Sequence, residues 1–374
     1  MNRHGTPRLA LRSAICAAGL VVPLIWASAC AGPGSPQSGP GSPPSGAGRA
    51  QQTPSPGSRA AAPTPEPSPT PTEPPRVSMT IVGDIMLARR VGDLMRDTGD
   101  FAAPLRPAAR RLAGADLTVG NLEGTLSRTG APRQGDDSFG ANPRALRGLR
   151  LAGFDVLTLA NNHVGDYGPR ALVETVERVR RAGIVPVGAG ADAQKAGRPA
   201  IVERAGVRFG FLAFNAIGET PEAGPGTPGA AQLRMQPRLG PLHRPGLRAL
   251  LADVRALRPR VDVLAVLPHW GDQYTHAPVP DQRTVASALV GAGADLVVGS
   301  HPHWIQGSEV RRGALVAYSL GNFVFDMDFS RETQRGIALE LTFRGGDRTA
   351  SSFSRVRIGA DFAPRFAAPP TPAG

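Results

Sequence analysis

Three apolar runs constrain the fold of this chain more than any other feature, because a loop with histidine follows each run. A continuous apolar run that ends in a polar loop predicts a parallel strand that is covered on both faces. In α/β proteins, the loops beyond the carboxyl ends of such strands carry many functional residues. The runs cover residues 154–159, 261–267 and 294–298, and their loops contain Asn162, His163, His269, His301 and His303.

Two earlier strands end in carboxylates. Asp84 follows the expected strand 77–82, and Glu123 follows the expected strand 116–119. Each side chain alone also fits a structural role, such as a helix cap for Asp84 or a buried structural histidine for His269. The carboxyl ends of parallel strands, however, meet at one edge of a sheet. Because carboxylate, amide oxygen and imidazole are ligands of divalent transition metals, the pattern as a whole predicts a shared metal site.

Residues 76–362 have the pattern of one folded domain. Strands and helices alternate at first and then give way to strands alone, which predicts an α/β domain with one mixed sheet or with two packed sheets flanked by helices. Residues 215–242 show no clear period and are expected to form a long loop. Strands are expected over 77–82, 116–119, 154–159, 184–187, 200–203, 207–214, 261–267, 294–298, 309–310, 315–319, 337–343 and 353–358, and helices over 87–96, 104–112, 143–152, 169–182, 246–257 and 281–292.

The ends of the chain have a different composition from this domain. Residues 1–30 combine a basic start, a short apolar stretch and small residues before Cys30, which is the pattern of a secretory signal. Cysteine at that position resembles a bacterial lipobox, in which the thiol is lipidated; an ordinary signal peptide or a membrane anchor is the alternative. Residues 31–75, rich in Pro, Gly and Ser, predict a disordered linker, and residues 363–374 predict a disordered tail. We therefore expect an extracytoplasmic lipoprotein anchored to the cell membrane.

The charge of the chain favours anionic partners. Its formal net charge is +12 at pH 7, and such a charge attracts acidic polymers, teichoic acids and lipid headgroups. Basic and aromatic residues are not interleaved as in nucleic-acid-binding proteins, so we expect no nucleic-acid partner. The only cysteines are Cys16 and Cys30, so the domain is expected to fold without disulfides.

Six motifs occur in order between residues 77 and 326. They are Gly83-Asp84-Ile85-Met86-Leu87, Asn121-Leu122-Glu123-Gly124, Ala160-Asn161-Asn162-His163 with Asp166-Tyr167-Gly168, His269-Trp270-Gly271, His301-Pro302-His303 and Tyr318-Ser319-Leu320-Gly321-Asn322-Phe323-Val324-Phe325. Together they resemble the CapA family, the poly-γ-glutamate capsule synthesis proteins. That family is similar to the calcineurin-like metallophosphoesterases, so the resemblance implies a metallophosphatase-like mixed β-sandwich flanked by helices.

The resemblance also implies a site for one or two divalent ions of Mn, Fe or Zn. His163, oriented by Asp166, would act as the catalytic acid. We further expect Asn121, Trp270 and Tyr274 to line the site and to bind substrate. The metal ligands implied by the resemblance are Asp84, Glu123, Asn162, His269, His301 and His303.

Two functions are open at this stage. The first is a tethered, metal-dependent hydrolase or transferase that serves the synthesis or export of an anionic envelope polymer such as poly-γ-glutamate, together with a membrane synthase or export complex. The second is a non-catalytic accessory protein that binds the polymer in a degenerate phosphoesterase cleft. The Asn162-His163 and His301-Pro302-His303 pairs favour chemistry. Met86 favours binding, because the phosphoesterases have a metal-binding histidine at that position.

Overall fold

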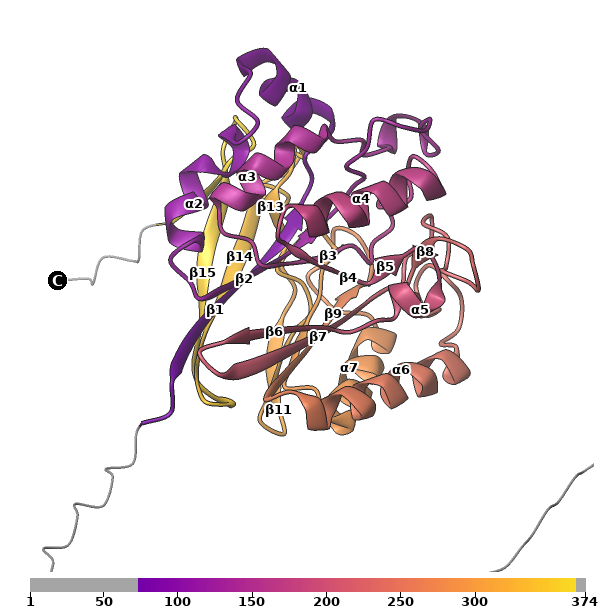
Figure 1. Cartoon of the computed structure of the whole chain (residues 1–374), viewed down its shortest axis with the longest axis vertical. Helices are drawn as coiled ribbons and strands as arrows, with labels where there is room; N and C mark the ends of the chain where they lie inside the picture. Colours follow the sequence, from indigo (N-terminus) through magenta and orange to yellow (C-terminus); the bar gives the residue numbers. More distant parts are fainter. Residues whose placement is uncertain (1–72, 368–374) are drawn as a thin grey trace, which may run out of the picture. The chain divides into compact units, whose positions relative to one another are not determined.

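The computed structural model describes residues 73–367, which form two mixed β-sheets packed face to face between two layers of helices (Figure 1). The first sheet has the strand order β16-β15-β14-β1-β2-β3-β4, with β13 beside β1, and the second has the order β11-β12-β10-β9-β7-β6. The predicted fold class is confirmed, in the form with two sheets.

The bounds of the elements follow the predicted ones closely in most cases. The strands of the first sheet are β1 (Arg76–Ile85), β2 (Leu117–Leu122), β3 (Val156–Thr158), β4 (Val185–Val187), β13 (Asn322–Val324), β14 (Arg335–Arg344), β15 (Asp347–Ile358) and β16 (Pro364–Phe366). Those of the second sheet are β6 (Ala200–Arg204), β7 (Val207–Asn215), β9 (Val263–His269), β10 (Leu296–Val298), β11 (Ser308–Arg311) and β12 (Ala314–Ala317). The main helices are α1 (Arg89–Thr98), α2 (Arg106–Leu112), α3 (Leu146–Leu151), α4 (Pro169–Arg181), α6 (Arg244–Leu257) and α7 (Pro280–Ala292).

The core has three apolar layers, because each sheet buries both of its faces. Alternate residues of β1, among them Met79 and Ile81, join Phe209 and Phe211 of β7 in the layer between the sheets. A second layer lies under α1 to α4, and a third lies under α6 and α7. Continuous apolar sequence suits β9 and β10 in particular, since every residue of these two strands is buried.

Local sequence signals set several element ends. The hairpin of β6 and β7 turns at Ala205 and Gly206, which both have positive φ (+48° and +77°). This is the conformation of a two-residue hairpin turn that matches the twist of the strands. Asn142 accepts a hydrogen bond from the amide of Arg144 and so caps the turn that leads into α3.

Other expectations were wrong. The predicted tail from residue 363 begins with β16, which pairs antiparallel with β15, and Ala363 is buried. The predicted loop 215–242 contains the short strand β8 (Gly229–Ala230), which pairs with β5 (Ala189–Gly190). Strands of two or three residues are too short to show a period in the sequence, and partners far along the chain define them.

The predicted signal segment, its Cys30 and most of the linker lie outside the described residues. Among residues 73–367, no helix has the length and apolar character that a membrane span requires.

Gly83 positions the end of β1, which carries Asp84. A Cβ at this position would overlap the carbonyl oxygen of Gly321, so the close approach of the two backbones requires glycine. We expect Gly83→Ala to lower the free energy of unfolding by about 1–3 kcal/mol, as overpacking does elsewhere. Gly307→Ala is the control, since its Cβ would meet nothing within 4 Å; it should change stability by at most about 1 kcal/mol in urea titrations. Equal effects of the two substitutions would contradict this role.

Candidate metal centre

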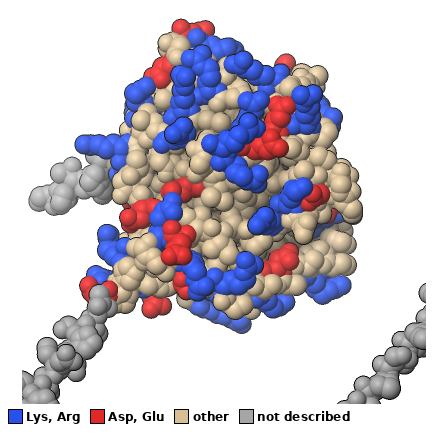
Figure 2. All heavy atoms as spheres, in the orientation of Figure 1, with Lys and Arg blue, Asp and Glu red and all other residues tan. Residues whose placement is uncertain are grey.

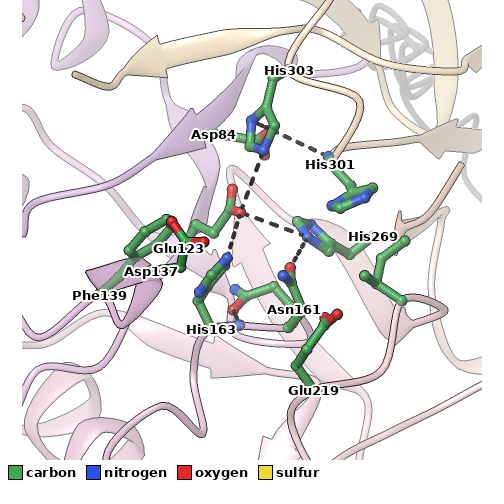
Figure 3. A network of polar contacts seen from close by, with 12 residues as sticks. Asp84, Glu123, Asp137, Phe139, Asn161, His163, Glu219, His269, His301 and His303 are labelled. Carbon is green, nitrogen blue, oxygen red and sulfur yellow. Dashed lines mark hydrogen bonds and ion pairs between the residues drawn. The ribbon is translucent and has the colours of Figure 1, made fainter. Parts of the chain in front are cut away.

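The candidate side chains meet at one end of the domain, between the strand ends of both sheets (Figure 3). The sequence pattern predicted that they lie at the edge of one parallel sheet. That prediction was wrong in the number of sheets, because two sheets supply them. β1, β2 and β3 of the first sheet bring Asp84, Glu123 and the loop with His163, while β9 and β10 of the second bring His269 and the loop with His301. The amide of His301 donates to Asp84 Oδ2 at 3.2 Å, which connects the two sheets directly.

Glu123 is the centre of this cluster. Its Oε1 lies 3.8 Å from His163 Nε2, 3.9 Å from His269 Nε2 and 3.9 Å from His303 Nε2 (Figure 3). The carboxylate is buried, and neither of its oxygens has a hydrogen-bond partner among the described residues. A buried carboxylate without a partner is costly, so the geometry indicates a missing positive ligand.

His301 shows the same lack of partners. Both of its ring nitrogens are buried and make no hydrogen bond within residues 73–367. Its backbone has φ +97°, an uncommon conformation for a residue with a side chain. Such strain persists only where the surrounding structure holds the residue in place, and it is frequent at functional sites.

The donor atoms are close enough to share a cation. Ligand atoms of Glu123, His301 and His303 lie within 4.8 Å of one another, and so do those of Asp84, Glu123 and His269. Asn162 adds its Oδ1, which lies 2.8 Å from His269 Nε2. Oxygen and imidazole donors in this mixture suit Mn, Fe or Zn. The residues present therefore fit the predicted divalent metal.

A surrounding layer of polar groups orients the imidazoles. His303 Nδ1 lies 2.9 Å from Asn322 Oδ1, so the ring donates there and leaves Nε2 unprotonated toward Glu123. His269 Nδ1 lies 2.9 Å from the hydroxyl oxygen of Ser300. Asn322 thus holds the candidate ligand His303 in place.

His163 has its own support. Its Nδ1 lies 2.8 Å from Asp166 Oδ2, and its ring stacks on Phe139 with a centroid distance of 3.7 Å. Asp166 also accepts hydrogen bonds from the Phe139 amide and the Gln134 side chain, so its position is tightly held. Because Asp166 holds Nδ1, His163 Nε2 faces Glu123 at the centre of the cluster.

Burial changes the ionisation of the cluster. It raises the pKa of Asp84 to about 7, against the opposing effect of hydrogen bonds from Asn121 and from the His301 amide. Burial, followed by the charge of Asp84, raises the pKa of Glu123 well above its usual range. Burial also lowers the pKa of His303 to about 4 and that of His301 well below its usual value. At neutral pH the imidazoles of His301 and His303 are therefore uncharged and able to donate lone pairs.

Two residues predicted to bind substrate are not placed to do so. Trp270 is fully buried in the core under α7, where its Nε1 donates to the carbonyl of Tyr318. Asn121 is also buried, and its amide donates to Asp84 Oδ1 and accepts from Asn161. Both predictions were wrong, because polarity and nearness in sequence do not show which way a side chain points.

Tyr274 does lie beside the site. It is half-buried, and its ring centroid is 6.2 Å from that of His303. On its outer side it contacts Phe329, which is 64% exposed. Tyr274 therefore lies beside the candidate ligand His303, and its contact with substrate stays a prediction.

Met86 does not replace the missing histidine ligand. Its side chain is buried in the apolar layer under α1 to α4, and its Sδ accepts a hydrogen bond from the amide of Ala88 at 3.0 Å. Met86 therefore supplies no metal donor near Asp84, where the phosphoesterases have a histidine.

Sequence reasoning missed several supporting residues. Gln134 and Phe139 lie in an irregular segment with no recognisable motif, and only the tertiary structure brings them to Asp166. Ser300 stands next to His301 in the sequence, so its position in a strand-end loop was the one available signal. Asn161 accepts from the amides of His163 and Val164, which makes it the local support of that loop.

Fold and site together define a class of protein: an α/β domain of two packed mixed sheets with a candidate metal centre at the strand ends. Within this class, the chain belongs to the bacterial capsule synthesis protein family PGA_cap, whose sequence profile matches residues 78–327.

Individual relatives agree with this assignment. The capsule biosynthesis protein CapA of Bacillus anthracis is 32% identical over 265 residues, which are 69% of this chain and 62% of that protein. The PGA biosynthesis protein CapA of Bacillus subtilis is 30% identical over 264 residues, 68% of this chain and 65% of that protein. The chain thus spans less than two thirds of the length of either relative. Among solved structures, a phosphatase from Mycoplasma pneumoniae is similar with a TM-score of 0.44 and 11% identity, over 76% of this chain and 94% of that chain.

Proposed function

We propose that this protein serves the synthesis or export of an anionic cell-envelope polymer through a divalent-metal, hydrolase-like site. The observation that supports it most is the buried Glu123 carboxylate, which has no hydrogen-bond partner in the described part of the chain and has three imidazole nitrogens within 3.9 Å. Asp84, Asn162, His269, His301 and His303 complete the proposed ligand set.

A divalent ion in this set would lower the pKa of a bound water and would withdraw charge from the bond under attack. The protein's own part is to hold donors and a proton in place. His163 is oriented by Asp166 through Nδ1, so its Nε2 can donate a proton to a leaving group at the centre of the cluster. Phe139 covers the His163 ring and excludes water from one side.

The polymer is proposed from the relatives and from charge. Both CapA relatives are named for capsule or PGA biosynthesis. Figure 2 shows many Lys and Arg side chains and fewer acidic ones on the visible face, and the exposed arginines on the helices of the first sheet and near their ends include Arg110, Arg147, Arg150 and Arg180. A surface of this sign attracts an acidic polymer such as poly-γ-glutamate.

We propose an extracytoplasmic, lipid-anchored location because of the signal pattern and Cys30, with a membrane synthase or export complex as partner. Cell fractionation tests the anchor: Cys30→Ala should move the protein from the membrane fraction to the soluble fraction. Retention of the variant at the membrane would contradict it.

Metal binding tests the site, and its pH dependence has a definite sign. Burial raises the pKa of Asp84 to about 7, so below that pH an ion must displace a proton. The imidazoles do not compete, because their pKa values are lowered. Calorimetry should therefore show Mn²⁺ affinity rising between about pH 5 and pH 7, by about tenfold per pH unit for each proton released.

The matched variants are His301→Ala, which should lose metal, and His243→Ala, which should retain it. His243 is exposed, unlike the buried candidate ligands, and its Nδ1 accepts a hydrogen bond from the amide of Gly246 at the start of α6. Affinity that does not change with pH, or equal metal content in the two variants, would exclude the proposed ligand set.

The alternative is a non-catalytic accessory protein that binds the polymer. The loss of a donor at Met86 favours it, and a Mycobacterium tuberculosis relative, 31% identical over 256 residues, is named a probable polyglutamine synthesis accessory protein. Under this alternative, the metal-loaded protein binds oligo-γ-glutamate but does not cleave it or any phosphodiester.

A further inference from the structure

Arg89 lies beside the candidate metal centre and has no role in the proposed chemistry. It is the first residue of α1 and closely follows the end of β1, which carries Asp84. Its guanidinium lies over the ring of Phe139, 4.6 Å from the centroid, and Phe139 stacks on His163. The Phe139 ring thus contacts both the Arg89 guanidinium and His163, the expected catalytic acid.

The guanidinium has N–H groups that the described residues do not use. One edge is bound to the buried carboxylate of Asp326. Nε is buried and has no hydrogen-bond partner in the range 73–367. The other terminal nitrogen lies 3.6 Å from Asp137, whose side chain is 80% exposed. A separation of 3.6 Å is too long for a hydrogen bond, so Asp326 holds the cation and Asp137 is only loosely associated.

The backbone of Arg89 is also unusual. Its φ is +45°, a left-handed conformation that costs about 1–3 kcal/mol for a residue with a side chain. Asp137 belongs to a short turn, Gly135–Asp137, in which no residue is buried. A strained, anchored cation therefore faces a carboxylate that can move away at little cost.

Arg89 and Asp137 lie on the His163 side of the cluster. Figure 3 shows Asp137 and Phe139 beside Glu123 and His163. Because the Arg89 guanidinium lies over the Phe139 ring and 3.6 Å from Asp137, both charged groups are close to the candidate metal centre.

We propose that Arg89 forms an oxyanion subsite next to the metal centre, and that Asp137 occupies the position of a substrate carboxylate or phosphate until the substrate displaces it. This inference rests on the proposed function, since it assigns the substrate a second anionic group beside the bond under attack. Guanidinium suits this role because it is permanently charged and its planar donors fit carboxylate and phosphate. A γ-glutamyl chain carries one free carboxylate per residue, so a unit at the metal centre brings a neighbouring carboxylate with it.

Binding of two probes to the full-length, Mn²⁺-loaded protein tests the subsite. The probes are a fluorescent oligo-γ-glutamate of about ten residues and glycerol 3-phosphate, the latter as competitor, and the readout is anisotropy. Arg89→Gln should weaken binding by about tenfold or more, the range expected for a lost charge pair. Asp137→Asn should tighten it severalfold, because the competing carboxylate is gone. Weakening of only one probe by Arg89→Gln identifies carboxylate or phosphate as the anion.

Matched controls separate this role from a structural one. Asp136 is exposed like Asp137 but makes no ion pair in the described part of the chain, and Arg248 is an exposed arginine on α6, outside the basic surface of the first sheet. Asp136→Asn and Arg248→Gln should leave probe affinity unchanged. If Asp137→Asn binds no more tightly than Asp136→Asn, or Arg89→Gln no more weakly than Arg248→Gln, the subsite does not exist. Mn²⁺ content should be unchanged in all four variants, so failure of the metal site is detected separately.

Discussion

Replacing Glu123 with glutamine is expected to stabilise the metal-free protein and to abolish its stabilisation by metal. The carboxylate is buried among the described residues without a hydrogen bond, and burial raises its pKa well above the usual range. An unsatisfied buried polar group costs about 1–3 kcal/mol, and the neutral amide of Glu123→Gln can donate to a neighbouring imidazole instead. We therefore expect unfolding free energy to rise by about that amount without metal.

Thermal unfolding with and without Mn²⁺ measures both effects. The wild type should gain stability with Mn²⁺, since a ligand that binds only the folded state stabilises it. Glu123→Gln should gain nothing. Glu177→Gln is the control, because Glu177 is exposed and pairs with Arg181 on the surface. A destabilised metal-free Glu123→Gln protein, or one that still responds to Mn²⁺, would contradict the assignment of Glu123 as the central ligand.

The second large effect is expected for Asp166→Asn in the hydrolase-like reaction. Asp166 holds His163 through Nδ1, and an amide in its place would favour the wrong tautomer of the imidazole. Loss of a positioned general acid typically costs about 10²–10⁴-fold in rate. Turnover of bis(p-nitrophenyl) phosphate should fall by that factor, while Mn²⁺ content stays the same.

The pH profile separates positioning from a merely structural effect. In Asp166→Asn the pH dependence of the rate should differ from that of the wild type, because the imidazole is no longer held as a proton donor. Asp272→Asn is the matched control, since Asp272 is exposed, lies three residues after His269 in the sequence and carries no predicted role. An unchanged profile in Asp166→Asn with reduced melting temperature would mean that Asp166 only supports the Phe139 and Gln134 segment.

Much of the site was predictable because strand-end chemistry is local in sequence. His269 directly ends the apolar run of β9, and Asp84 lies within β1 near its end, so a pattern of apolar residues followed by ligand types located both. Orientation was not predictable in the same way. Trp270 follows His269 immediately, yet it turns into the core and donates to Tyr318. Adjacent residues in an irregular loop can point in opposite directions, and no periodicity reports which.

By itself, the sequence determined the alternation of strands and helices, the polar strand-end loops and the residue types able to bind a metal, since short-range periodicity and composition encode these. Only the tertiary structure decided that two sheets supply the cluster, that Glu123 lies at its centre, and that Asn121 supports Asp84 instead of facing substrate. It also brought Arg89 and Asp137 together beside the Phe139 ring that stacks on His163. These are contacts between residues far apart along the chain, and their geometry depends on how the sheets pack.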